Sequence, residues 1–259
     1  MSIPQASNPV GSVKNISQIL DIIKENGGAT LSEIESQMNL SLSSIHNYLA
    51  TLREEEFIVK KDNTYHLSLL FLDFSTVARD RYAILEAARE EIDELASETD
   101  EMVNLLVEEY GRGIHIYRQG GQKALDYAEY TGYRGYLHNS AAGKCILANK
   151  NPDRIEEILE YHGMVQTARS TITDPDKLSH ELDDIRESGI AFDNQESLNG
   201  CRCVAAPVID NSNQEVVGAI SVSGPKRRMK GDWYNEELPE MIRDATNVIE
   251  VKLSYNTSS

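Results

Sequence analysis

Four side chains that can do chemistry fall within one apolar stretch near the C-terminus, residues 189–225. An acid (Asp193), a thiol (Cys203) and two hydroxyls (Ser221 and Ser223) lie on or beside runs rich in Val, Ala and Ile. A hydrophobic core has no use for such groups, whereas a ligand pocket uses a few polar groups in apolar walls to fix a ligand's orientation. Because Ser221 and Ser223 are two apart on a predicted strand, their side chains share one face. The stretch therefore predicts a site that senses a small molecule.

Catalysis and metal binding are the competing interpretations of these groups. Cys203 could be a nucleophile with His138 or His162 as base and Asp193 as orienter, but no motif joins these residues, and a buried Cys is more often an inert small side chain. Zinc takes His and Cys ligands, and those to consider are His138, Cys145, Cys201 and Cys203. The Cys-x-Cys spacing is not typical of zinc sites. We therefore predict no catalytic residue, no metal and no cofactor.

A helix predicted over 140–149 adds an anion-binding element. With Ser140 as N-cap, the amides of Ala141, Ala142 and Gly143 are expected to be free at a helix N-terminus, which favours anions. Small side chains there let a ligand approach the backbone. The alternative is a helix packed closely on a sheet. The ligand that suits these groups is a small carboxylate, hydroxy acid or sugar acid, with Asp193 accepting a hydrogen bond from its hydroxyl.

Composition bounds the class of protein. The chain has 259 residues and a net charge of −17, with 42 acidic against 25 basic residues. The acids are spread along the chain, since residues 1–72 carry −3 and the rest −14. This balance fits an ordinary acidic protein or, as we favour, one from a cell with molar internal salt, where self-repulsion is screened. Three cysteines, a polar N-terminus and the lack of long apolar runs predict a cytoplasmic protein with no membrane segment.

Residues 12–68 have the pattern of three short helices followed by a hairpin. Thr30 and Glu33 form a capping box for the second helix, Ser41 or Ser43 caps the third, and Asp62-Asn63 suits a tight hairpin turn. The predicted elements are helices over 13–25, 30–38 and 43–55 and strands over 57–61 and 64–67. This is the layout of a winged helix-turn-helix, in which the third helix enters the major groove of DNA.

The side chains expected to meet DNA are polar rather than strongly basic. Hydroxyl and amide groups suit base edges and phosphates, and Asn can bond adenine bidentately. The expected contacts are Ser43, Ser44, His46, Asn47 and Arg53 on the third helix and Lys60 and Lys61 on the hairpin. The alternative is a winged helix used only for protein contacts, because Glu54, Glu55 and Glu56 crowd the end of the third helix.

The rest of the chain alternates helices with antiparallel strands. The apolar run 69–78 is predicted to be a connecting helix that packs on the wing and on a partner subunit. Beyond it, helices are expected over 82–98, 140–149, 152–161, 175–188 and 232–253, and strands over 102–108, 114–119, 125–130, 203–209 and 216–223. This order predicts an α+β sensor fold. The basic cluster Lys226-Arg227-Arg228 is expected to be a solvated surface turn.

Five segments resemble the isocitrate-lyase-regulator (IclR) family of transcription factors. They are residues 19–75, YLHNSAAGKCILA, the run from Thr171 to Ser197, GCRCVAAPV and GAISVSGPKRRM. The chain departs from the family at Ser41, Leu42 and Asn47, where Pro, Lys and often Arg are usual, and at Glu56 and Ser68, where Gly is common. The recognition helix has therefore lost positive charge.

The resemblance implies a ligand-responsive regulator that binds a double-stranded DNA operator as a homodimer or homotetramer. It implies a winged helix-turn-helix (12–68), a linker helix (69–80) and a GAF-like α/β effector-binding domain (81–255), between a disordered N-terminus (1–11) and a C-terminal tail (256–259). It also implies an effector pocket lined by Ala141, Ala142, Asp193, Cys203, Ser221 and Ser223. The alternative is a sensor or interaction protein whose winged helix does not bind DNA.

Overall fold

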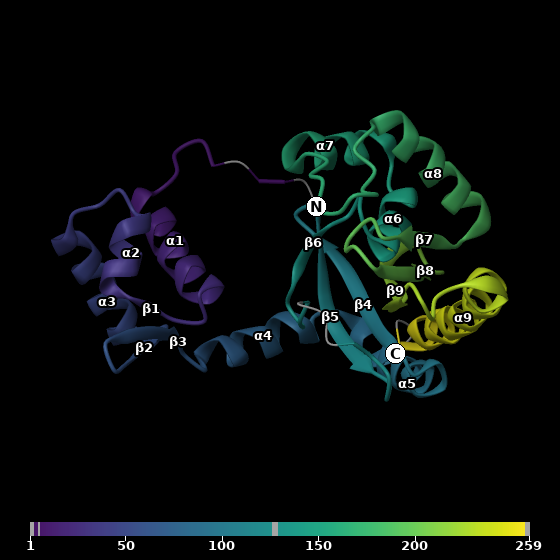
Figure 1. Ribbon diagram of the computed structural model, residues 1–259, viewed down its shortest axis with the longest axis horizontal. Helices are drawn as coiled ribbons and strands as arrows, with labels where there is room; N and C mark the ends of the chain where they lie inside the picture. The colour runs from purple at the N-terminus through teal and green to yellow at the C-terminus, as the bar shows by residue number, and fades with distance from the viewer. Residues whose placement is uncertain (1–2, 5, 126–128, 257–259) are drawn as a thin grey trace. The chain divides into compact units, whose positions relative to one another are not determined.

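The computed structural model describes residues 3–4, 6–125 and 129–256. The contacts within the chain separate two compact units, one spanning 5–81 and the other 82–259 together with residues 1–4. Figure 1 labels the helices and strands of both units.

The N-terminal unit contains three helices, a small sheet and a fourth helix. Its elements are α1 (Gly11–Glu25), β1 (Ala29–Thr30), α2 (Leu31–Gln37), α3 (Leu42–Glu54), β2 (Ile58–Lys61), β3 (Thr64–Leu67) and α4 (Leu70–Asp80). The sheet has the order β1-β3-β2, and both pairings are antiparallel. Isoleucines and leucines spaced along α1, α2 and α3 fill its core, including Ile19, Ile34, Ile45 and Leu49. This is the predicted winged helix-turn-helix, with the two-residue strand β1 added.

The caps and the turn of this unit follow the predictions. Thr30 accepts a hydrogen bond from the Glu33 amide, and the Glu33 carboxylate accepts one from the Thr30 amide, which completes the capping box. Ser41, rather than Ser43, caps α3 by accepting from the Ser44 amide. Asp62 and Asn63 both have positive φ (48° and 66°), as a tight two-residue hairpin requires.

The linker helix α4 presents an apolar surface. Leu69, Leu72 and Val77 are 80%, 63% and 69% exposed. Only one side of the helix packs within its own unit, where Phe71 and Phe74 lie with their ring centroids 5.9 and 6.2 Å from that of Phe57. An amphipathic helix normally buries such a stripe against another element.

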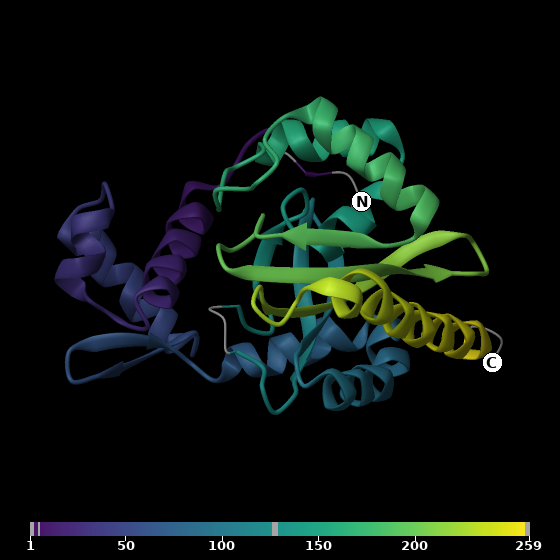
Figure 2. The same ribbon diagram turned by 45° about the vertical axis from the view of Figure 1, so that its right-hand side comes forward.

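The C-terminal unit is a six-stranded antiparallel sheet with helices on both faces. Its order is β6-β5-β4-β9-β8-β7. The strands are β4 (Met102–Glu109), β5 (Arg112–Gly120), β6 (Arg134–Tyr136), β7 (Ala191–Asn194), β8 (Cys201–Asp210) and β9 (Glu215–Pro225). The helices are α5 (Ala83–Thr99), α6 (Ala141–Ala148), α7 (Pro152–His162), α8 (Pro175–Ser188) and α9 (Leu238–Asn256), the last preceded by a π-helical turn over Trp233–Glu237. Figure 2 shows α7 and α8 on one side of this sheet and α5 and α9 on the other.

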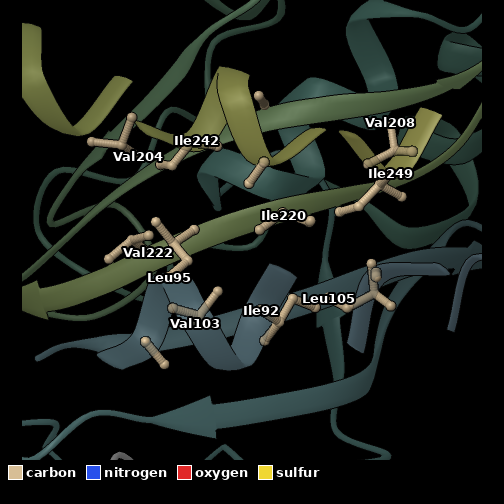
Figure 3. Close-up of a cluster of buried hydrophobic side chains, with 14 of the residues drawn as sticks. Ile92, Leu95, Val103, Leu105, Val204, Val208, Ile220, Val222, Ile242 and Ile249 are labelled. Carbon is tan, nitrogen blue, oxygen red and sulfur yellow. The ribbon is translucent and has the colours of Figure 1, made fainter. Parts of the chain in front are cut away.

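The main core lies between the sheet and the pair α5 and α9. Val103, Leu105, Val204, Ile220 and Val222 point from the strands toward these helices (Figure 3). Because side chains alternate along a strand, the intervening positions point toward α6, α7 and α8. The α+β sensor fold and its antiparallel sheet are thus as predicted.

Two predicted elements differ from the structure. The strand expected over 125–130 includes residues 126–128, which lie outside the described residues. The strand that pairs with β5 on this side is β6. The single final helix begins instead with a π-helical turn. Among the residues that the structure describes, no helix is long and apolar enough to cross a membrane.

Candidate effector pocket and DNA-binding surface

The sheet brings together the four polar side chains singled out in residues 189–225, which are Asp193, Cys203, Ser221 and Ser223. Asp193 on β7 pairs with Cys203 on β8, which pairs in turn with Ser223 on β9. One row further along, Ser221 pairs with Asn104 on β4. All five residues are buried, and their positions alternate with those of the main core. The polar groups therefore lie in two adjacent rows on the face of the sheet that α6 covers.

The Asp193 carboxylate is held by the loop that follows it. One oxygen accepts from the Glu196 amide at 2.6 Å, and the other accepts from the amide and the hydroxyl of Ser197. Burial raises the pKa of Asp193, and these hydrogen bonds oppose that rise. A carboxylate oxygen has a second lone pair, so Asp193 retains capacity to accept from a ligand hydroxyl.

Helix α6 begins as predicted but has one free amide fewer than expected. The Ser140 hydroxyl accepts from the Gly143 amide at 3.2 Å, so that amide is not available to a ligand, which corrects the prediction. Ala141 and Ala142 are 1% and 5% exposed and pack in the same cluster as Cys203. The alternative of a helix packed closely on the sheet therefore describes α6, with the first two amides remaining at its N-terminus.

A buried lysine ties α6 to the loop that holds Asp193. Lys144 is 0% exposed, and its ammonium lies 2.8 Å from both carboxylate oxygens of Glu196 and also contacts Glu181 on α8. The pKa of Lys144 is raised, since these two carboxylates outweigh the cost of burial. Burial also raises the pKa of Glu196 to about 7, against the attraction of Lys144 and with the charge of Asp193 adding to the rise.

The raised pKa of Glu196 predicts a pH dependence of stability. The pKa of Glu196 is near 4.5 in the unfolded state and about 7 in the folded state. Between pH 4.5 and 7 the folded state therefore keeps a proton that the unfolded state has lost. Glu196 thus makes the free energy of unfolding fall as the pH rises through this window. Glu196→Gln is expected to flatten the slope, whereas Glu187→Gln, on the exposed side of α8, should leave it unchanged. The slope is measured by urea unfolding at pH 5, 6, 7 and 8, followed by the fluorescence of the single tryptophan, Trp233. Equal slopes in wild type and Glu196→Gln would contradict the assignment.

A partly open cavity of about 90 Å³, lined by both polar and apolar groups, lies beside these rows. Leu106, Tyr133 and Tyr136 form part of its wall. Its polar wall residues are His115, Glu129, Asn139, Ser140, Thr167 and Ser197. None of the six predicted effector residues is in this wall, but Ser197 bonds to Asp193 and Ser140 caps the helix that begins with Ala141.

Two residues that sequence reasoning missed connect the cavity to the serines. Asn104 donates to the hydroxyls of Ser223 (3.2 Å) and Ser221 (3.5 Å), and its side-chain oxygen accepts from Arg118 Nε at 2.7 Å. A second nitrogen of the guanidinium donates to the backbone carbonyl of Glu129, a wall residue. The signal in the sequence was an Asn inside the apolar strand VNLLV. Likewise, Lys144 is the only charged residue of the helix AAGKCILA.

The catalytic and zinc interpretations find no support in the geometry. His138 bonds to the carbonyl of Val165 and His162 to that of Tyr110, so neither is bonded to Cys203. The pKa of Cys203 is raised well above the usual thiol value by its contact with Cys201 and by burial, which removes the thiolate. No group of three or more His, Cys, Asp or Glu side chains that could hold a metal occurs within residues 3–4, 6–125 and 129–256.

The basic cluster 226–228 is only partly a solvated turn. Lys226 and Arg227 are exposed. Arg228, in contrast, makes a two-point ion pair with the buried Glu101, with Nε–Oε1 and Nη2–Oε2 distances of 2.5 and 2.6 Å. The turn is as predicted, but the expectation of a solvated side chain is wrong for Arg228.

The predicted DNA contacts lie on one helix and one hairpin of the N-terminal unit. Ser43, His46, Asn47 and Arg53 are exposed on α3, and Ser44 is half-buried. The hydroxyls of Ser43 and Ser44 both bond to that of the cap Ser41, at 3.0 and 2.8 Å. On the hairpin, Lys60 and Lys61 are exposed, and the Lys60 ammonium lies 5.2 Å from the ring centroid of Tyr65.

Comparison with known proteins agrees with this architecture. A family model described as "Bacterial transcriptional regulator IclR C-terminal" matches residues 76–251, and a winged helix-turn-helix model matches residues 12–69. A probable HTH-type transcriptional regulator, ArcR, of Halobacterium salinarum is 34% identical over 96% of this chain and 98% of its own length. KdgR of Escherichia coli is 26% identical over 95% of this chain and 94% of its own.

Solved structures give the same result. The crystal structure of the Thermotoga maritima IclR is similar with a TM-score of 0.76 and 29% identity, covering 94% of this chain and 99% of that one. The C-terminal domain of E. coli KdgR is similar with a TM-score of 0.60 and 28% identity over 66% of this chain. These relatives are transcriptional regulators and not enzymes. With a family model matching more than half of its length, the chain belongs to the IclR family of transcriptional regulators.

Proposed function

We propose that this regulator senses a small carboxylate, hydroxy acid or sugar acid in its C-terminal unit and changes its operator affinity in response. The observation that carries the proposal is the pair of buried rows that hold Asp193, Cys203, Ser221 and Ser223 beside a small, partly open cavity. Burying polar groups is costly unless they are hydrogen-bonded, and Asp193 still has a lone pair to accept with, so the concentration of such groups at one place supports a ligand site. Ala141 and Ala142 complete the proposed pocket with the remaining amides of α6.

The relatives are consistent with this class of ligand. One solved structure, similar with a TM-score of 0.80 but only 19% identical, is an IclR homologue complexed with 4-hydroxybenzoate, a carboxylic acid that also carries a hydroxyl. The Halobacterium relative supports a cytoplasmic protein of a high-salt cell, as the net charge of −17 predicts.

We propose that α3 reads the operator and that the hairpin contacts phosphate. The exposed polar side chains of α3 suit base edges, with Asn47 best placed to specify a base by bidentate bonds. At about 1 M salt the Debye length is roughly 3 Å, so counterion release adds little and hydrogen bonds carry more of the binding. The low positive charge of α3 is compatible with DNA binding under those conditions. The competing function is a sensor whose winged helix makes only protein contacts.

We propose further that the protein is a homodimer or homotetramer. The apolar stripe of α4, with Leu69, Leu72 and Val77, is the surface that supports association. Effector binding would then favour one arrangement of the winged helices in the oligomer, which is a population shift.

Operator recognition is tested by selecting duplexes from a random pool in 0.2 to 2 M KCl. We expect one sequence family to be enriched, and Asn47→Ala to cost about 1–3 kcal/mol on it, because a bidentate pair contributes that much discrimination. Ser36→Ala on the exposed side of α2 is the matched control. Absence of sequence preference at every salt concentration would favour the sensor that does not bind DNA.

The pocket is tested separately by thermal unfolding with a panel of small organic acids and sugar acids. Asp193→Ala and Ser223→Ala are each expected to abolish the stabilisation that an effector gives to the wild type, because both residues belong to the row of polar groups proposed to contact the ligand. If both variants still respond as the wild type does, the pocket lies elsewhere.

A further inference from the structure

An exposed leucine begins the helix proposed to read the operator. Leu42 is the first residue of α3 and is 48% exposed. The other large apolar side chains of this helix face inward: Ile45, Leu49 and Leu52 are buried, and Tyr48 packs against the same core. Among the residues that the structure describes, Leu42 belongs neither to that core nor to the side chains packed against it. The folding of the N-terminal unit therefore does not explain a leucine at this position.

A single exposed apolar residue is ordinary on a protein surface, so its place in the fold decides what it means. In a helix-turn-helix protein, the N-terminal residues of the recognition helix contact base edges in the major groove. Leu42 occupies that end of α3, and His46, one turn further along the same side of the helix, is exposed as well. Leu42 therefore adjoins the polar side chains that we propose contact DNA.

The hydroxyl groups around Leu42 are engaged with one another. The Ser41 hydroxyl oxygen accepts from the Ser44 amide at 3.2 Å, and it lies 3.0 and 2.8 Å from the hydroxyl oxygens of Ser43 and Ser44. This network holds the first turn of α3, and with it the backbone of Leu42. Because this backbone is already ordered, a contact made by Leu42 loses little conformational freedom when DNA binds.

Thymine is the base that offers an apolar partner in the major groove. The edges of adenine, guanine and cytosine present hydrogen-bond donors and acceptors there, whereas thymine adds its C5-methyl group. A leucine side chain can neither donate nor accept a hydrogen bond. Its contact with a base edge is therefore favourable at a methyl group and costly at a polar group that loses water. A leucine that meets base edges thus discriminates in favour of thymine.

A methyl contact also suits binding at high salt. Arg53, in the last turn, is the only Lys or Arg of α3. At about 1 M salt, screening weakens the contacts that depend on charge. An apolar contact involves no charge and releases no counterion, so its contribution to binding persists. Leu42 can therefore add specificity to α3 without adding positive charge.

We propose that Leu42 is a specificity-determining residue that contacts the C5-methyl group of an operator thymine in the major groove. This inference rests on the proposed reading of the operator by α3, and it adds the base that is read and the residue that reads it. The competing role is a leucine that packs on another protein or along the sugar–phosphate backbone, where no single thymine methyl group would matter.

The test replaces thymine by uracil, which lacks only the methyl group. The full-length protein is measured on the duplex selected in 0.2 to 2 M KCl, with each thymine changed to uracil in turn. We expect the change to weaken wild-type binding roughly fourfold at one thymine or more, the factor for burying one methyl-sized group. The ratio of the uracil and thymine Kd values should be the same at 0.2 and 2 M KCl, because the contact carries no charge.

Variants then assign this ratio to Leu42. Leu42→Ala should bind the thymine and uracil duplexes equally, and Leu42→Met, of similar volume, should keep part of the preference. Val13→Ala on α1 removes another exposed apolar side chain, 62% exposed, and should keep the full ratio. Asn47→Ala should bind more weakly overall and still prefer thymine at this position, because it loses a different contact. Since Leu42 lies outside the core, Leu42→Ala should unfold at the same urea concentration as the wild type when followed by circular dichroism.

The possible outcomes separate the role of Leu42 from operator binding itself. If no sequence is enriched at any salt concentration, operator reading by α3 fails, and Leu42 has no thymine to read. If a sequence is enriched but no uracil substitution weakens wild-type binding, the thymine contact is overturned and operator reading stands. If Leu42→Ala keeps the wild-type ratio of the two Kd values, another residue contacts the methyl group and the role of Leu42 is wrong.

Discussion

Replacing Lys144 by Met is expected to lower the free energy of unfolding of the C-terminal unit by about 3–5 kcal/mol at pH 8. Lys144 is completely buried and neutralises Glu196 and Glu181. Methionine fills similar volume, so the loss comes from leaving two carboxylates without their cation. At pH 5 the loss should be smaller, because Glu196, whose pKa is raised to about 7, can take up a proton. Urea unfolding followed by Trp233 fluorescence at the two pH values measures both quantities.

A surface lysine with the same number of carboxylate partners shows whether burial, rather than the number of ion pairs, causes the loss of stability. Lys252 also has two carboxylate partners, Glu90 and Glu91, each 2.9 Å away, but its side chain is 35% exposed. Lys252→Met is expected to cost at most about 1 kcal/mol, as for other surface pairs. If Lys144→Met costs no more than Lys252→Met, the buried cluster does not hold the unit together as the structure indicates.

Replacing Gly143 by Ala is expected to lower the stability of the same unit by about 3 kcal/mol, the upper end of the range for overpacked sites. A Cβ atom there would lie 2.3 Å from the carbonyl oxygen and 2.6 Å from the Cα of Leu137, both backbone atoms that cannot rotate away. Helix α6 would have to shift, and with it the Ser140 cap and Lys144. We therefore expect the response to small acids to be lost along with stability.

Gly135→Ala on β6 is the control for this substitution. Its Cβ would meet only side-chain atoms of Tyr133, at 3.4 and 4.0 Å, which is ordinary contact. Its stability should stay within about 0.5 kcal/mol of the wild type in the same urea experiment. Equal stability of Gly143→Ala and Gly135→Ala would show that α6 is free to move, which would contradict its close packing on the sheet.

Local signals in the sequence were sufficient to predict most of the fold. The capping box at Thr30, the turn at Asp62-Asn63 and the helix start at Asp174-Pro175 each depend on a few neighbouring residues, and the structure has all three. Strand β6 was missed because Arg134–Tyr136 is too short for a period-two pattern. Its pairing with β5 is a tertiary property.

The site was predictable only in part, and for a similar reason. Asp193, Cys203 and Ser223 stand out as polar residues on apolar strands, yet their alignment across three strands depends on register, which the sequence does not display. The Gly143 amide was expected to be free because the sequence does not show which backbone amide the Ser140 hydroxyl will accept from. Arg118 and Lys144 were missed because a charged residue in the sequence gives no sign of which buried partners it will meet.

The central claim is that the C-terminal unit controls operator binding, and the most direct test is the operator Kd measured with and without a saturating acid in 1–2 M KCl. We expect the Kd to change by roughly 5- to 150-fold, the operator to shift the acid's affinity by the same factor, and Ser223→Ala to remove the effect. An acid that binds the protein but leaves the operator Kd unchanged would contradict the account.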